Sequence, residues 1–236
     1  MRTTAIILLA LALSVWSAVT FVVDFRAGPY RALAERLETA TGSVRDPRYI
    51  ARIERALSND DIFSLCSREL VRSAASIRLA LLDTSYQDDD AGVREAALAK
   101  ARDTLKRSLR CYPRDGNFWL RLAMVEFART GPTSSVQEML RASLAAAPSD
   151  AWVIVPRIEF ASRLLGSDPQ GAEEILRIDV ENLVRHGRVS DVADLYVSVN
   201  EPVRRIFRDA LEGLDEERLM AIESAIARRV PVPATE

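Results

Sequence analysis

Leu105-Lys106-Arg107-Ser108-Leu109-Arg110-Cys111-Tyr112-Pro113 recurs as Leu140-Arg141-Ala142-Ser143-Leu144-Ala145-Ala146-Ala147-Pro148. Both stretches follow the pattern L-x-x-S-L-x-x-x-P, and their starts lie 35 residues apart, which is within the period of helical repeat arrays. A repeat of this length folds as a pair of antiparallel helices that buries its apolar face by stacking on neighbouring pairs. The sequence therefore predicts an all-α protein that binds other molecules along its helices.

The composition agrees with a folded helical chain. The 236 residues are 48% apolar and 28% charged, and strict alternation of apolar and polar residues is rare. The formal net charge is −2, and the only two lysines are Lys100 and Lys106. Because no stripe of basic residues stands out, we expect no nucleic acid partner.

The N-terminal region is the most apolar part of the chain. No charged residue occurs from Ala5 to Val23, and a helix of this length spans roughly 28 Å, close to the hydrocarbon thickness of a bilayer. We predict that residues 1–24 form a transmembrane anchor whose residues 5–23 contact lipid. A signal peptide cleaved near Ser17 and a buried core helix are the alternatives.

Proline, glycine and acidic residues divide the remaining chain. Gly28-Pro29 and Asp46-Pro47 are typical of helix starts, so we expect short connecting helices within residues 25–58. A helical domain is predicted for residues 59–229, with its last helices at about 169–186, 189–199, 201–212 and 214–229. We expect Pro156 to make the segment that starts at Ala151 irregular, and residues 230–236 to form a flexible tail.

The central block, roughly residues 91–150, resembles a tetratricopeptide repeat. Trp119, Leu122 and Ala123 match the W-x-x-L-G/A opening of that repeat. The later positions of the repeat, which take small, bulky and proline residues, match Val136, Leu140, Ser143 and Pro148 with one residue inserted. The preceding unit keeps only the corresponding second half, as Ala101, Leu105, Ser108 and Pro113. The resemblance implies an α-solenoid of stacked helical hairpins. It departs from the family at Glu126, where the repeat has an aromatic residue.

A second resemblance concerns the stretch from Cys111 to Ala123, CYPRDGNFWLRLA, together with the N-terminal anchor. This arrangement is similar to tetratricopeptide-like proteins associated with exopolysaccharide or envelope assembly in Gram-negative bacteria. It implies a single-pass protein of the bacterial inner membrane with a periplasmic body. The expected function is that of a scaffold or adaptor for protein partners in the membrane or periplasm.

The resemblance also indicates where a partner would bind. In a tetratricopeptide-like helix the groove-facing and rim positions fall on Asn117, Leu120, Arg121, Met124 and Phe127. Because this helix is apolar on nearly all sides, something must cover both of its faces. Either a partner helix or peptide occupies the groove, or the C-terminal helices of the chain fold over it.

The two cysteines, Cys66 and Cys111, permit two interpretations. In an oxidising compartment they could form a disulfide that closes a loop of about 45 residues, worth on the order of 4 kcal/mol in the chain-entropy model. They could equally be two separate buried thiols. With one distant histidine, His186, they do not make a convincing zinc site, and we expect no metal or cofactor.

Motifs of catalysis are missing from the sequence. There is no G-x-S-x-G, no phosphate-binding glycine loop and no H-E-x-x-H, so we expect no enzymatic activity. The alternative function is a hydrolase or transferase that acts on envelope glycans with two carboxylates. The carboxylates available in the central block are Asp115, Glu126, Glu138 and Glu159.

Overall fold

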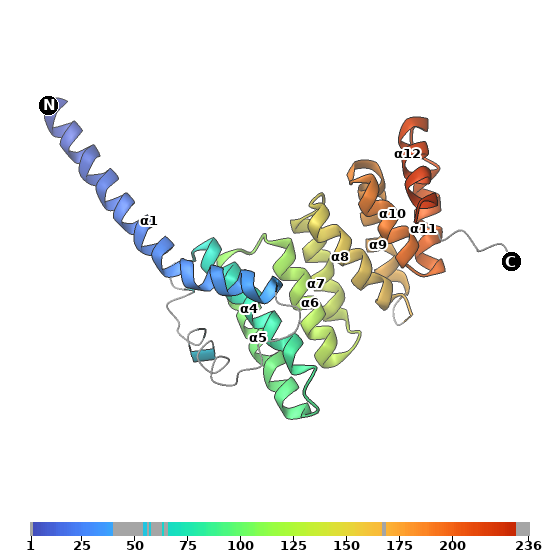
Figure 1. Cartoon of the computed structure of the whole chain (residues 1–236), viewed down its shortest axis with the longest axis horizontal. Coiled ribbons are helices and arrows are strands. Elements are labelled where there is room, and N and C mark those ends of the chain that lie inside the picture. Colours follow the sequence, from blue (N-terminus) through green and yellow to red (C-terminus); the bar gives the residue numbers. More distant parts are fainter. Residues whose placement is uncertain are drawn as a thin grey trace. The chain divides into compact units, whose positions relative to one another are not determined.

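The computed structural model describes residues 2–39, 54–55, 57, 63, 66–166 and 169–229 (Figure 1). Over these residues the chain forms α-helices and no strand, which confirms the all-α prediction. Two compact units are present, Met1–Pro113 and Arg114–Glu236, so the range 59–229 is divided between them. The predicted tail at 230–236, and most of the connecting helices predicted within 25–58, lie outside the described residues.

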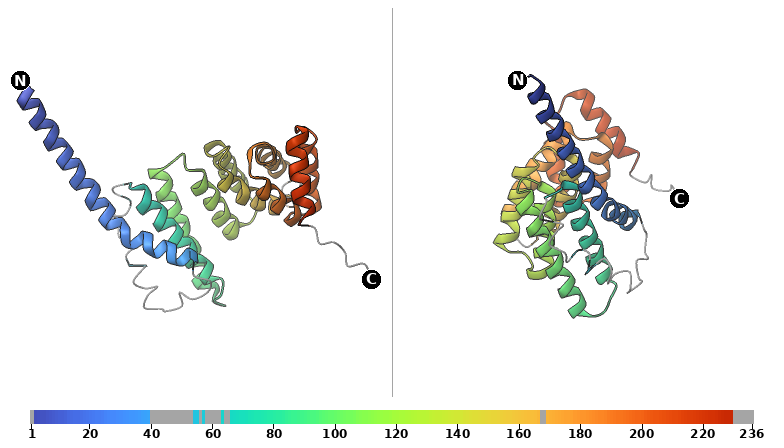
Figure 2. Two further views of the ribbon diagram at one scale, coloured as in Figure 1. Left: turned by 45° about the horizontal axis from the view of Figure 1, so that its top comes forward. Right: turned by 90° about the vertical axis from the view of Figure 1, so that its left-hand side faces the viewer.

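The first unit contains α1 (Arg2–Thr39), α4 (Arg68–Ser85) and α5 (Ala91–Cys111). The prediction that a new helix starts at Gly28-Pro29 is wrong, because Pro29 lies inside α1. Proline removes one backbone hydrogen bond and bends a helix without necessarily ending it. Accordingly, α1 changes direction along its length in both ribbon views (Figures 1 and 2).

Helices α1, α4 and α5 pack in sequence order, α1 on α4 and α4 on α5. The second half of α1 contributes Ala27 and Ala34 to a core that also contains Leu70, Ala74 and Ile77 of α4. Small residues on α1 let its backbone approach α4 closely. The side chain of Asp90 caps α5 by accepting a hydrogen bond from the backbone N–H of Gly92, as expected of an aspartate at a helix N-terminus.

The first half of α1 differs from the second half in its surface. It carries large apolar side chains that are exposed: Ile6, Ile7, Leu9, Leu11, Leu13, Val15, Trp16, Phe21 and Phe25. Over the residues that the structure describes, no helix is both long enough and apolar enough to cross a bilayer. The anchor at residues 5–23 stays a prediction.

The second unit is built from seven helices within its described residues. They are α6 (Gly116–Thr130), α7 (Ser134–Ala146), α8 (Ala151–Leu164), α9 (Pro169–His186), α10 (Val189–Ser198), α11 (Glu201–Leu211) and α12 (Glu216–Ala227). Helix α6 pairs with α7, and α8 pairs with α9 (Figure 2). The pairs also contact each other, α6 on α8 and α7 on α9, while α11 packs on α9 and α10 on α12.

Side-chain caps begin four of the helices in this unit, α6, α7, α11 and α12. Asp115 accepts hydrogen bonds from the backbone N–H groups of Asn117 and Phe118, and Thr133 accepts one from Val136. Gly131, with φ 73°, ends α6 in a conformation that other residues rarely adopt. The helices predicted after residue 169 are confirmed to within a few residues.

The irregular segment predicted around Pro156 is replaced by a regular helix. Helix α8 runs from Ala151 to Leu164 with Pro156 inside it. The ring removes one helical hydrogen bond, the one to the carbonyl of Trp152. Burial of Val153, Ile154 and Ile158 in the core of the unit outweighs this loss, since each fully buried aliphatic side chain stabilises by roughly 1.5–3 kcal/mol.

Candidate functional site

Helices α6 and α7 cross very closely at the residue that begins α6. A Cβ atom on Gly116 would lie 2.4 Å from Cβ of Ala147 and 2.9 Å from the carbonyl oxygen of Ser143. No side chain fits in that space, so glycine is required there for steric reasons. The start of α6 thus lies against the end of α7, and the two helices run antiparallel.

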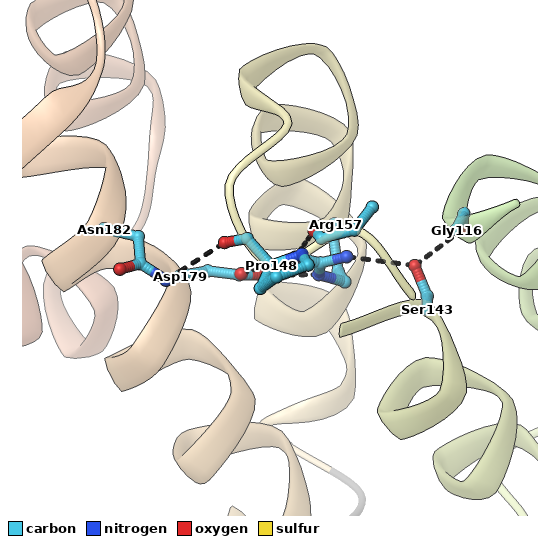
Figure 3. Close-up of polar contacts among 7 residues, drawn as sticks. Gly116, Ser143, Pro148, Arg157, Asp179 and Asn182 are labelled. Atoms are coloured by element: carbon cyan, nitrogen blue, oxygen red, sulfur yellow. Dashed lines mark hydrogen bonds and ion pairs between the residues drawn. The ribbon is translucent and has the colours of Figure 1, made fainter. Parts of the chain in front are cut away.

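A buried arginine connects this crossing to the next pair of helices (Figure 3). Arg157 on α8 donates from Nε to Oδ2 of Asp179 and from Nη2 to Oδ1, each at 2.6 Å. Its Nη1 donates to Oγ of Ser143 at 3.0 Å, and Nη2 also donates to the carbonyl of Ala147 at 3.1 Å. Ser143 in turn donates to the carbonyl of Gly116 at 2.7 Å. One guanidinium therefore joins four helices, α6 to α9.

Both charged groups in this network are removed from water. The side chains of Arg157 and Asp179 are each 0% exposed. Burial raises the pKa of Asp179 above its ordinary value, and the hydrogen bonds and charge of Arg157 oppose that rise. Because every guanidinium nitrogen of Arg157 donates a hydrogen bond, the buried charge is fully compensated. The network is suited to hold the helix pairs in register.

Arginine plays a similar part at two more helix ends. Arg218 on α12 donates to the carbonyls of Val184 and Gly187 at 2.6 and 2.7 Å, at the end of α9. Arg204 on α11 donates to the carbonyl of Tyr196 at 3.1 Å, near the end of α10. The last carbonyls of a helix have no partner inside that helix, and a cation also complements its dipole. No pattern in the sequence predicts these contacts of Arg218 and Arg204.

The predicted groove residues are mostly covered. Leu120 is 0% exposed and belongs to the core of the second unit, so its prediction as a groove contact is wrong. Met124 and Phe127 are partly buried against the same core, and the ring of Phe127 meets Phe160 edge-on at 5.5 Å. These side chains pack between α6 and α8. Of the alternatives left open by the sequence, the structure favours coverage by the following helices of the chain.

The two polar residues of the predicted groove remain half-buried. Asn117 and Arg121 are neither fully enclosed nor fully exposed, and Nη1 of Arg121 contacts the sulfur of Met124 at 4.0 Å. An apolar side chain that is well exposed in this unit is Trp152, at 56%, on the first turn of α8. A partner could reach these positions, whereas it could not reach Leu120.

Two of the candidate catalytic carboxylates have structural contacts. Asp115 caps α6, as described above, and Glu126 pairs with Arg129 at 3.1 Å. Glu159 on α8 and Glu138 on α7 are both exposed. Among the described residues, no group of three or more His, Cys, Asp or Glu side chains is placed to hold a metal ion.

The two cysteines lie in the first unit and are bonded to each other. The S–S distance of Cys66 and Cys111 is 2.06 Å, and their Cα atoms are 5.3 Å apart. The hydroxyl of Tyr112 donates to the carbonyl of Cys66, and the guanidinium of Arg68 lies over the Tyr112 ring at 5.5 Å. The bridge joins Cys66, two residues before the start of α4, to the last residue of α5.

A cavity in the first unit was not foreseen from the sequence. It has a volume of about 390 Å³ and is lined by Glu54, Arg78, Leu81, Thr84, Ser85, Asp88, Val93, Ala96, Ala97 and Lys100. Arg78 and Lys100 both bind the carboxylate of Glu54, and the Arg78 Nη1 to Glu54 Oε1 distance is 2.7 Å. Arg78 and Lys100 lie 22 residues apart on different helices, so no local pattern in the sequence relates them.

No protein-family model, curated protein or solved structure matches this chain.

Proposed function

We propose that this protein is a helical-repeat adaptor that binds protein partners in the bacterial envelope. The observation that carries the proposal is the arrangement of α6 on α8 and α7 on α9, held by the fully buried Arg157. Helical-repeat arrays likewise stack successive helix pairs so that each pair contacts its neighbours. Rigid arrays of this kind present extended surfaces for binding.

Under this proposal the accessible binding residues are Asn117 and Arg121 on α6 and Trp152 on α8. Half-buried polar residues and exposed tryptophans are both common in protein interfaces. Met124 and Phe127 support the surface from behind by packing on the core. Leu120 does not contact the partner, because its side chain is fully buried.

We further propose that residues 5–23 insert into the inner membrane and that the body lies in the periplasm. The support for the anchor is the absence of charge from Ala5 to Val23, together with the exposed apolar side chains that α1 presents there. The Cys66–Cys111 disulfide supports an oxidising compartment. The resemblance of residues 111–123 to envelope-assembly proteins supports the choice of the periplasm.

Site-specific photo-crosslinking of the full chain in native membranes tests the adaptor proposal. A photoreactive amino acid replaces Arg121 or Trp152 in separate variants, and Met220 on α12, which is also 56% exposed, is the matched control. We expect both test positions to capture the same envelope protein, identified by mass spectrometry, and position 220 to capture none. Adducts from all three positions, or from none, would refute the proposed surface.

The membrane proposal needs its own experiment. Cell fractionation should place the full chain in the inner-membrane fraction resistant to alkaline extraction, and external protease should digest the body only after the outer membrane is opened. A variant with Leu9, Leu11 and Leu13 changed to glutamine should be released into the soluble fraction. Retention of that variant in the membrane would count against residues 5–23 as the anchor.

A further inference from the structure

The cavity between α4 and α5 has the size of a small-molecule site. Its volume of about 390 Å³ falls in the range of roughly 300–1,000 Å³ typical of ligand pockets. All of its lining residues belong to the first unit. None of them takes part in the proposed adaptor surface, so what this cavity binds is a separate question.

Three of the charged residues that line the cavity bind one another: Arg78, Lys100 and Glu54. Arg78 is only 6% exposed, and its Nη1 donates to Oε1 of Glu54. Its Nε is buried and donates no hydrogen bond. A buried donor without a partner is costly, by about 1–3 kcal/mol, and more for a charged group. Asp88 also lines the cavity, so its two cations are balanced by two carboxylates, and the unpartnered Nε–H of Arg78 is the group that a ligand would satisfy.

The geometry of a guanidinium indicates which group would satisfy Arg78. A carboxylate binds an arginine most strongly when it accepts hydrogen bonds from two parallel N–H groups. The N–H groups of Nε and of the adjacent Nη form one such pair. Glu54 engages Nη1 and leaves Nε without a partner. Partial burial raises the pKa of Glu54, but the hydrogen bonds and charges of Lys100 and Arg78 outweigh this effect and lower it below the ordinary value. The two cations therefore favour an ionised carboxylate at the position of Glu54, and the Nε–H of Arg78 remains to donate to a second one.

The rest of the cavity is largely apolar. Leu81 of α4 and Val93, Ala96 and Ala97 of α5 supply aliphatic surface. The hydroxyls of Thr84 and Ser85 donate to backbone carbonyls of their own helix, which leaves only their acceptor lone pairs for a ligand. The small alanines on α5 leave room for a short chain. The lining thus combines cationic donors with aliphatic surface.

We propose that this cavity binds a small monocarboxylate with a short aliphatic chain. The carboxylate lies against Arg78 and Lys100, and the chain extends along Leu81, Val93 and Ala97. A phosphate would find the same cations but would leave the aliphatic wall without a contact. An alkylammonium has no acceptor to offer the Nε–H of Arg78.

Protection of Lys100 from acetylation tests the proposal directly. The full chain is treated with a limiting acetylating reagent in the presence of hexanoate, and mass spectrometry reports the modification of Lys100 and Lys106. Because Lys106 is exposed on the same helix and does not line the cavity, it is the internal control. We expect hexanoate to slow the acetylation of Lys100 toward a limiting value as its concentration rises. The acetylation of Lys106 should not change. Hexylamine, hexanol and inorganic phosphate should give little protection.

Two variants distinguish the cavity from a general salt effect. Ala97→Phe fills the apolar wall without altering a charge, and Arg78→Lys keeps the charge but removes the parallel donors. Each should raise the hexanoate concentration needed for half-protection by about tenfold or more. Circular dichroism checks that each variant is folded. In Lys106→Ala, hexanoate should protect Lys100 as well as it does in the unaltered chain. Absence of saturable protection in the unaltered chain, or equal protection in Ala97→Phe, would overturn the proposal. Protection by phosphate as strong as by hexanoate would also overturn it.

Discussion

Arg157 and Asp179 form a bidentate ion pair with two contacts of 2.6 Å, and both side chains are completely buried. They come from α8 and α9, and Arg157 also reaches Ser143 and Ala147 at the end of α7. In the packing of a repeat array, such a pair can specify which face of one hairpin meets the next. This relationship makes the second unit sensitive to changes at a few positions.

Removal of one partner from this pair should strongly destabilise the second unit. Asp179→Asn or Arg157→Met leaves a buried group without its charge partner, and we expect a loss of about 3–5 kcal/mol in the free energy of unfolding. Replacement of both residues by apolar ones should cost less than the sum of the single changes. Chemical denaturation, followed by circular dichroism, measures each loss.

The control for this experiment is the ion pair of Arg177 and Glu173, also on α9. Its N–O distance is 3.0 Å, but both side chains are about half exposed at 50%. Arg177→Met should therefore change the free energy of unfolding by less than about 0.5 kcal/mol. Equal losses from Arg157→Met and Arg177→Met would contradict the structural role of the buried pair.

Gly116→Ala should destabilise the α6–α7 pair. Alanine favours a helix more than glycine, but here its Cβ would collide with Ala147 and the carbonyl of Ser143. We expect a net loss of roughly 1–3 kcal/mol, as in other overpacked sites, measured by thermal or chemical unfolding. Gly213→Ala is the control, since nothing lies within 4 Å of the position of its Cβ. If Gly116→Ala were as stable as that control, the close crossing would be disproved.

Acid should weaken the first unit through Glu54. Because its pKa is lower in the folded chain than its ordinary value of 4.5, the carboxylate contributes stability that is present above that value. This contribution is lost as the pH falls through the lowered pKa, when Glu54 is protonated and releases Lys100 and Arg78. The unaltered chain should therefore lose stability more steeply with acidification than Glu54→Gln, which cannot ionise.

The pH comparison is made by denaturation at a series of pH values from about 7 down to about 3. At neutral pH, Glu54→Gln should be less stable by about 2 kcal/mol, because its neutral amide cannot form the charge-assisted hydrogen bonds that the carboxylate makes with two cations. Asp194 and Glu201 also have lowered pKa values, and they remain in both proteins, so the difference between the two curves isolates Glu54. Parallel curves would show that Glu54 does not titrate as described.

Reduction of the Cys66–Cys111 bridge should destabilise the first unit. The bridge closes a loop of 45 residues, and the chain-entropy model assigns about 4 kcal/mol to a loop of this length. Cys66→Ser with Cys111→Ser should lower stability to the level of the reduced chain, and a reductant should have no further effect on that variant. The check is thiol blocking of the unreduced protein, followed by non-reducing electrophoresis. If the blocking reagent labels both cysteines, the bridge is not formed.

Local sequence signals predicted the helices well where capping groups and apolar spacing agree. Asp90, Asp115 and Thr133 start helices because their side chains bond to backbone N–H groups two or three residues away. Pro29 and Pro156 misled the prediction, because packing compensated for the hydrogen bond that each proline removes. Leu120 was misassigned because a resemblance to a repeat identifies a helix face but does not reveal what covers that face.

The sequence by itself determined that the chain is helical, where most helices of residues 68–227 begin and end, and that residues 5–23 are uncharged, because these properties depend on neighbours a few positions apart. Only the tertiary structure decided that Leu120 is buried, that Arg157 binds Asp179, and that Arg78 and Lys100 share a cavity with Glu54. Those pairings join residues 22 or more positions apart on different helices. They depend on how apolar faces pack, which sets distances and burial that no local pattern of residues contains.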